Sequence, residues 1–203
     1  MISDGYGSPR GGAKHQGVDV MFAKLATDPY PLGVNATKGY VMPDAWMAIA
    51  ASDGVLWSAD KSERGWQVVI DHGPGSVATY YQHLSALYVP ITKPPVKGTP
   101  RAQMPLVKAG QPLGVIGADP LDKGGVKHLH FEVWTAGPSN AIDPAQLMKS
   151  WEVVGSTDVG QLVARNLRNI SAREAAMIEK RKKYGDRVPV EGHFRAWPGT
   201  AHG

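Results

Sequence analysis

The stretch His128-Leu-His-Phe-Glu-Val-Trp134 decides the fold class, because its polar and apolar residues alternate without a break. Successive side chains of a β-strand point to opposite faces, so each residue can be assigned to one side. One face carries His128, His130, Glu132 and Trp134, and the other carries Leu129, Phe131 and Val133. The pattern predicts a strand of a half-buried antiparallel sheet.

Short strand-like stretches separated by turns continue this pattern upstream. Residues 46–50 and 54–57 flank a Ser-Asp-Gly turn and predict a β-hairpin. Further strands are predicted at 67–70, 77–81 and 112–116. The chain has 24 Gly and 16 Pro in 203 residues, well above the average share of about 12 % for the two together. The expected fold is therefore mainly β: a small antiparallel β-sheet domain rich in turns.

Two proline-rich regions interrupt the series of predicted strands, and a predicted helical region follows it. Residues 24–43 and 90–105 are rich in proline and predict long loops, which are either functional or mobile or only decorate the surface. After Trp151 apolar residues recur at helical spacing over 159–170, and a second helix is predicted over 171–183. We therefore expect two domains, a β domain over 1–150 and a helical C-terminal extension over 151–203.

The charge of the chain is unevenly distributed. Residues 1–155 carry 13 basic and 13 acidic side chains, whereas residues 156–203 carry 9 and 5, so the whole net charge of +4 lies in the extension. The run Lys180-Arg-Lys-Lys183 has only one neighbouring aromatic residue, Tyr184, and reads as a solvated helix end. No nucleic-acid partner is expected.

Other classes of protein are excluded by what the sequence lacks. It has no cysteine, which excludes a disulfide framework, a thiolate zinc site and a cysteine nucleophile. No apolar stretch reaches the length of about 18 residues that spans a bilayer, so no transmembrane segment is expected. The first ten residues have neither the basic start nor the apolar core of a signal peptide.

Two histidine motifs suggest a metal site. The two-residue spacing of His128 and His130 places both rings on one face of a strand, and Asp19 follows His15 by four residues, with Gly17 permitting a tight path between them. Neutral imidazole and carboxylate are common zinc ligands. Two nitrogens and one carboxylate would leave the fourth tetrahedral position for water, as in a catalytic zinc site.

Four motifs in order resemble one family. They are His15-Gln-Gly-Val-Asp19, Tyr81-Gln-His83-Leu-Ser85, Gly110-Gln-Pro-Leu-Gly-Val-Ile-Gly117 and His128-Leu-His130-Phe-Glu132. Together they resemble the zinc metallopeptidases typified by lysostaphin and LytM, which are peptidoglycan endopeptidases. The resemblance covers roughly residues 4–148 and ends in Ile142-Asp-Pro144. It implies a small antiparallel β domain with a long groove crossed by the zinc. The loops over 24–43 and 90–105 are insertions relative to the compact family pattern, and we expect them to narrow or wall this groove.

The resemblance also implies site residues. By motif position, His15, Asp19 and His130 would be the ligands of one Zn²⁺ per chain, and His83 and His128 would be catalytic residues that do not bind the metal. Either His83 or His128 would take a proton from the attacking water, and the sequence leaves open which of them does so.

Four further positions are less clearly assigned. Arg10 resembles the arginine of the family's aromatic-Gly-x-Arg opening, with one extra residue after Tyr6-Gly7. Glu132 is expected either to orient a ligand or to lie on the surface. His72 is interpreted as structural, whereas His193 and His202 match no motif.

The implied function is hydrolysis of peptide cross-links or stem peptides in bacterial peptidoglycan, in the periplasm or outside the cell. A D-alanyl–diaminopimelate bond is the preferred cleavage site, with a glycyl-glycine bridge as the alternative. The absence of a signal peptide and the helical extension favour delivery as a phage tail or virion-associated lysin, with the extension contacting particle proteins. A trimmed leader and release through a separate membrane lesion are alternatives. A rival function is a structural or regulatory component of a larger assembly with a catalytically silent fold.

Overall fold

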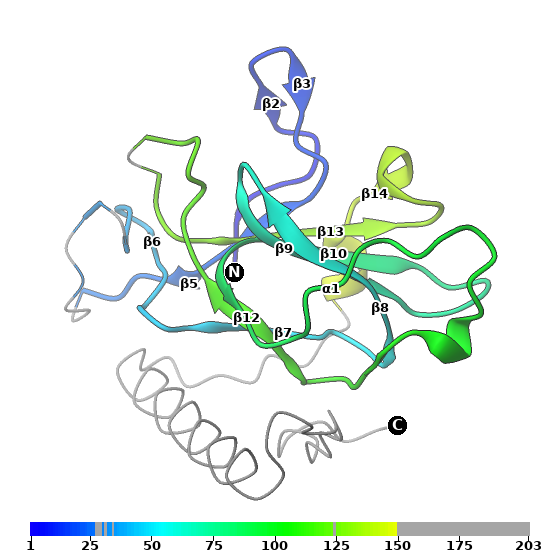
Figure 1. Cartoon of the computed structure of the whole chain (residues 1–203). Coiled ribbons are helices and arrows are strands. Elements are labelled where there is room, and N and C mark those ends of the chain that lie inside the picture. The colour runs from blue at the N-terminus through cyan, green and yellow to red at the C-terminus, as the bar shows by residue number, and fades with distance from the viewer. Residues whose placement is uncertain (27–29, 31, 34, 124, 150–203) are drawn as a thin grey trace, which may run out of the picture.

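Antiparallel strands make up most of the fold. The structure is a computed structural model that describes residues 1–26, 30, 32–33, 35–123 and 125–149. Ten strands of this part form one sheet, with the main order β1-β4-β13-β10-β9-β8-β11, while β12 pairs with β10 and β7, and β14 pairs with β13 (Figure 1). Every pairing is antiparallel, which confirms the predicted mainly β fold class.

The strands of the main sheet have the following bounds: β1 (Ile2–Asp4), β4 (Val18–Val20), β7 (Met47–Ile49), β8 (Gly54–Ser62), β9 (Gly65–Asp71), β10 (Ala78–Leu87), β11 (Leu106–Val107), β12 (Pro112–Ile116), β13 (Leu129–Trp134) and β14 (Ala141–Ile142). Two small two-stranded sheets consist of β2 (Pro9–Arg10) with β3 (Ala13–Lys14), and of β5 (Phe22–Ala23) with β6 (Tyr40–Val41). The short helices are η1 (Arg101–Gln103), η2 (Pro138–Asn140) and α1 (Ala145–Met148).

The strand predicted from the alternating stretch is β13, and it is buried on both faces. Its apolar face enters the main core, where Phe131 and Val133 are 2 % and 0 % exposed. The opposite face is also covered, since Glu132 and Trp134 are only 6 % and 8 % exposed. The expectation of a half-buried strand was wrong, because β13 lies between β4 and β10 and its polar face is filled by hydrogen-bonded side chains.

The predicted hairpin between residues 46–50 and 54–57 was also wrong. Strand β7 pairs with β12, and the backbone at Ala50 continues this contact through hydrogen bonds with Gly110 and Gln111. Strand β8 pairs with β9 on one edge and with β11 on the other. Both edges of β8 are therefore occupied by partners other than β7. The predicted strands at 67–70, 77–81 and 112–116 correspond to β9, β10 and β12.

Both predicted long loops contain some regular structure. The first includes β6, which pairs with β5. The second is attached to the sheet: Thr92 exchanges backbone hydrogen bonds with Ala59, and Arg101 in η1 forms an ion pair with Asp71 at the end of β9. The predicted extension over 151–203 lies outside the described residues. In the described part of the chain, no helix is sufficiently long and apolar to span a membrane.

Candidate metal centre and adjoining groove

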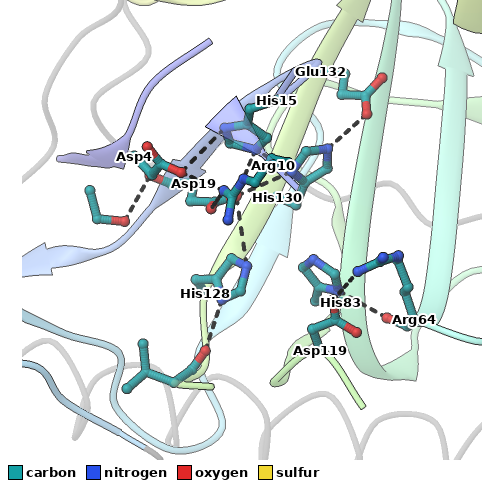
Figure 2. Close-up of polar contacts among 12 residues, drawn as sticks. Asp4, Arg10, His15, Asp19, Arg64, His83, Asp119, His128, His130 and Glu132 are labelled. Atoms are coloured by element: carbon teal, nitrogen blue, oxygen red, sulfur yellow. Dashed lines mark hydrogen bonds and ion pairs between the residues drawn. The ribbon is translucent and has the colours of Figure 1, made fainter. Parts of the chain in front are cut away.

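Three side chains from two strands and a loop converge on one point. The Nε2 atom of His15 lies 2.9 Å from Nδ1 of His130 and 3.2 Å from Oδ1 of Asp19, and His130 Nδ1 lies 3.1 Å from the same oxygen (Figure 2). Two donors about 2.0–2.2 Å from a tetrahedral metal would be roughly 3.3 Å apart, so the triangle has nearly the size that one metal ion needs. The structure thus brings together His15, Asp19 and His130, the three residues predicted as ligands.

The close approach of β4 to β13 produces this triangle. Asp19 and His130 are directly paired across the two strands, which sets their side chains next to each other. Gly17 lies so close to β13 that a Cβ atom there would be 2.3 Å from the carbonyl oxygen of Phe131 and 2.8 Å from Cγ of Glu132. Only glycine fits this position, which gives a structural reason for the His-x-Gly-x-Asp motif.

Hydrogen bonds from the far side of each ring fix which nitrogen faces the triangle. Nδ1 of His15 donates to the carbonyl of Gly5 at 2.9 Å, and Nε2 of His130 donates to Glu132 at 2.7 Å. Each ring therefore presents its other nitrogen to the centre, as metal-binding histidines commonly do. Glu132 also accepts a 2.5 Å hydrogen bond from the indole of Trp134, so the expectation of a surface carboxylate was wrong.

The second carboxylate oxygen of Asp19 is held by Arg10. The guanidinium donates to Asp19 Oδ2 at 2.7 Å and to Asp4 Oδ2 at 2.5 Å. Arg10 lies on the β2–β3 hairpin, which projects from the sheet (Figure 1). This contact fixes the rotation of the Asp19 carboxylate and leaves Oδ1 directed at the two imidazoles.

His83 and His128 lie side by side next to the triangle, with ring centroids 4.7 Å apart (Figure 2). Nδ1 of His83 donates to the carbonyl of Arg64 at 2.9 Å, and Nδ1 of His128 donates to the carbonyl of Val126 at 2.8 Å. In the neutral rings Nε2 is therefore the acceptor. The Nε2 atom of His128 is 3.7 Å from Asp19 Oδ1.

An irregularity in β10 aims His83 at the centre. The registers of β10 with β9 and with β12 both shift around Leu84, and His83 has a φ of 65°. This left-handed conformation is unusual for a residue with a side chain and costs on the order of 1 kcal/mol or more. Neighbouring backbone groups hold it in place, including a 2.6 Å hydrogen bond from the amide of Gly117 to the His83 carbonyl. Bulges often redirect side chains at functional sites.

The buried charges shift the pKa values of these groups in opposite directions. Burial and the neighbouring positive charges of His128 and His130 lower the pKa of His83 to about 4, so its ring is neutral at pH 7. Burial alone would lower the pKa of His130, but hydrogen bonds with Asp19 and Glu132 outweigh it and raise the pKa to about 9. Burial alone would raise the pKa of Asp19, yet hydrogen bonds with His130 and His15 hold it well below its usual range.

These shifts predict how pH affects the protein after removal of metal by a chelator. Because the pKa of His130 is raised from 6.5 to about 9 on folding, its stabilising contribution is complete below pH 6.5 and is lost as the pH rises through 9. The loss should amount to a few kcal/mol at most. Thermal unfolding of the chelated protein across this range measures it. The Glu132→Gln variant, which lacks one of the two carboxylates, should show a smaller decrease; an equal decrease in both proteins would contradict this assignment.

A groove adjoins the metal centre on the same face of the sheet. It has a volume of about 770 Å³ and crosses strands β13, β10, β9 and β8. Trp134 and Tyr80 stack in its floor with ring centroids 5.0 Å apart, and Glu132 borders it beside the metal centre. Pro94 of the second long loop also lines the groove, which supports the expectation that this loop forms a wall. The described residues of 24–43 do not line it.

Several groups that position the site were absent from the sequence prediction. The carbonyls of Gly5, Arg64 and Val126 orient three of the four histidines, and backbone groups leave no signature in a single sequence. Asp119, which is 6 % exposed and forms an ion pair with Arg64, also gave no signal. His72 forms hydrogen bonds through both ring nitrogens, with the Asp53 carbonyl and the Thr79 hydroxyl, in agreement with a structural role.

Comparisons with solved structures agree with the architecture. The catalytic domain of lysostaphin, an antimicrobial peptidase from Staphylococcus simulans, is 26 % identical over 74 % of this chain and 92 % of its own, with a TM-score of 0.51. LytU has the same TM-score at 20 % identity, over 73 % of this chain and 83 % of its own, and shows the shared fold. No curated protein sequence matches the chain.

A family model gives the classification. The model of Peptidase family M23 matches residues 39–144, which is just over half of the chain. The matched range includes His83, His128 and His130, while His15 and Asp19 precede it and reach the same centre through the pairing of β4 with β13. The chain belongs to Peptidase family M23, a lysostaphin-like group of β-sheet peptidases.

Proposed function

We propose that this protein is a zinc-dependent endopeptidase that hydrolyses peptide cross-links or stem peptides of bacterial peptidoglycan. The observation that carries the proposal is the buried triangle of His15, Asp19 and His130, which lies beside two further histidines at one end of a groove. Peptidase family membership supports the reaction class, and the likeness to lysostaphin supports the cell wall as the source of the substrate.

The donor set fits Zn²⁺. It consists of two imidazole nitrogens and one carboxylate oxygen. In each group the other nitrogen or oxygen is hydrogen-bonded to the protein, so the donor atom is left to bind the metal. Three protein ligands leave one position open, as in catalytic zinc sites. When bound, zinc would polarise the scissile carbonyl and lower the pKa of a coordinated water from 15.7 to about 7.

The chain's own residues would handle the proton and the developing charge. In their neutral forms His83 and His128 carry a free Nε2 atom beside the triangle, so one of them can accept a proton from the attacking water. A protonated imidazole at this place can then donate to the tetrahedral oxyanion or to the leaving amine. The low pKa of His83 keeps its ring neutral at pH 7 but also makes it a weaker proton acceptor than an ordinary imidazole.

Three other expectations stay predictions. Delivery by a phage tail or virion depends on the extension over 151–203, which lies outside the described residues, and so do the suggested particle partners. Action in the periplasm or outside the cell follows only from the proposed substrate. The rival function, a catalytically silent component of a larger assembly, would need the same fold without turnover.

A clearing assay on purified peptidoglycan tests the proposed activity. The zinc-loaded protein should clear peptidoglycan embedded in a gel, a chelator should stop the clearing, and added Zn²⁺ should restore it. Peptidoglycan of several cross-link types should be used, since the bond that is cut is unknown. A protein that binds one zinc per chain but clears none of these substrates would support the catalytically silent alternative.

A further inference from the structure

Three carboxylates line the groove next to the metal centre. The charged residues among the described positions that line it are Asp60, Asp71 and Glu132, and lysine and arginine are absent from this lining. These three carboxylates lie on β8, β9 and β13, so they are spread across the floor of the groove rather than gathered at one point. A groove of this kind favours a substrate segment that carries positive charge.

Two of the three carboxylates are already satisfied by the protein. Glu132 is hydrogen-bonded to His130 and Trp134 and is 6 % exposed. Asp71 is paired with Arg101 of the second long loop and accepts a hydrogen bond from the amide of Gly73. These two groups therefore contribute little free acceptor capacity to a ligand.

Asp60 differs from them. Its Oδ1 accepts a 2.7 Å hydrogen bond from Nε2 of Gln67, whose own Oε1 accepts from the Tyr80 hydroxyl at 2.8 Å. This chain across β10, β9 and β8 fixes the orientation of the Asp60 carboxylate. Among the described residues, the partner of its Oδ2 is Nζ of Lys93, in a loose ion pair at 3.9 Å, and the Lys93 side chain is 81 % exposed. Such a contact is weak and easily displaced.

An aromatic side chain lines the same groove as this carboxylate. The register of β8 with β9 shifts between Leu56 and Ser58, so Trp57 occupies the extra position of an irregularity in the strand. Its side chain is 38 % exposed and lines the groove together with Asp60 and Pro94. An irregularity that turns a tryptophan into a groove provides an apolar surface for an aliphatic chain and a ring face for a cation.

We infer that Trp57, Asp60 and Pro94 form a subsite for a substrate residue with a primary ammonium group on a flexible aliphatic side chain. Three strand spacings, about 14 Å, separate β13 from β8, and an extended peptide covers that distance in about four residues. The ammonium group would thus belong to a residue within about four positions of the bond that is cut. The inference rests on the proposed function and narrows its substrate to stem peptides with a free diamino-acid amine.

Cleavage of a matched substrate pair tests the subsite. One substrate is a cross-linked muropeptide dimer with a free diamino-acid amine, and the other is the same dimer with that amine acetylated. The zinc-loaded wild-type protein should cleave the free-amine dimer with a kcat/KM about tenfold higher than that for the acetylated dimer, because its KM is lower. Asp60→Asn keeps an acceptor for Gln67 but removes the charge, so it should cleave both dimers at the slower rate. Glu63→Gln, on an exposed residue outside the groove, is the matched control and should behave like wild type.

The outcomes separate the subsite from the activity itself. Equal cleavage of both dimers by the wild type, or unchanged preference in Asp60→Asn, would overturn the subsite and leave the proposed function intact. Absence of cleavage of either dimer despite bound zinc would count against the proposed function. In that case titration calorimetry with the two dimers still decides the subsite: tighter binding of the free-amine dimer, lost in Asp60→Asn, supports it, and equal binding refutes it.

Discussion

Replacement of His130 by alanine should abolish stoichiometric zinc binding and lower the rate of peptide hydrolysis by about 10³-fold or more, equivalent to roughly 4 kcal/mol of activation free energy. His130 supplies one corner of the donor triangle and connects it to Glu132. Its loss leaves two donors, too few to hold the ion against competing water. Zinc content by mass spectrometry of the metal, together with the rate of muropeptide cleavage, measures both effects.

Variants of the two neighbouring histidines should distinguish the loss of metal binding from the loss of catalysis. His83→Ala and His128→Ala should retain one zinc per chain, because neither ring belongs to the triangle, yet lose about 10²- to 10⁴-fold in rate. His72→Gln is the control, since the partners of His72 among the described residues are the Asp53 carbonyl and the Thr79 hydroxyl, outside the metal centre, and it should retain both zinc and activity. Full zinc content in His130→Ala, or loss of zinc in His128→Ala, would refute the assignment of ligands.

Gly17→Ala should disrupt the metal centre without altering any ligand. The added Cβ would meet the Phe131 carbonyl oxygen at 2.3 Å, and a backbone atom cannot move aside as a flexible side chain can. Strand β4 must then separate from β13, which pulls Asp19 away from His130. We expect a loss of about 3 kcal/mol of unfolding free energy, a decrease in Tm of roughly 10 °C, and loss of zinc binding.

A second glycine provides the matched control. Gly39 has no atom within 4 Å of an added Cβ, so Gly39→Ala should unfold at nearly the wild-type temperature and bind zinc normally. Thermal unfolding and zinc content of the two variants should be measured side by side. If Gly17→Ala had the stability and zinc content of the wild type, the pairing of β4 with β13 would not depend on the close approach at Gly17.

Much of the site followed from short motifs because side-chain alternation is a local property. The two-residue spacing of His128 and His130 predicted that both rings point to the same side, and His128 lies directly before β13 while His130 lies within it. The glycine between His15 and Asp19 indicated a tight backbone path. The sequence could not show that these segments would pair. Asp19 and His130 are 111 residues apart, and their register depends on packing across the whole sheet.

The errors have a common physical origin. The failed hairpin came from a local turn signal, whereas the partners of β7 and β8 were decided by distant strands that occupy their edges. Glu132 was assigned either to the site or to the surface, and only the burial of β13 on both faces decides between them. Likewise, the groove and its Asp60 subsite depend on side chains from separate strands, each of which is unremarkable in sequence.

Whether the zinc-loaded protein cuts peptide bonds of peptidoglycan is measured by mass spectrometry of the fragments that it releases from purified peptidoglycan. We expect muropeptides with new peptide amino and carboxyl termini on intact glycan, which appear with zinc and disappear with a chelator or in His130→Ala. Fragments that arise only from glycan cleavage, or no fragments from any peptidoglycan type at one bound zinc per chain, would contradict this expectation.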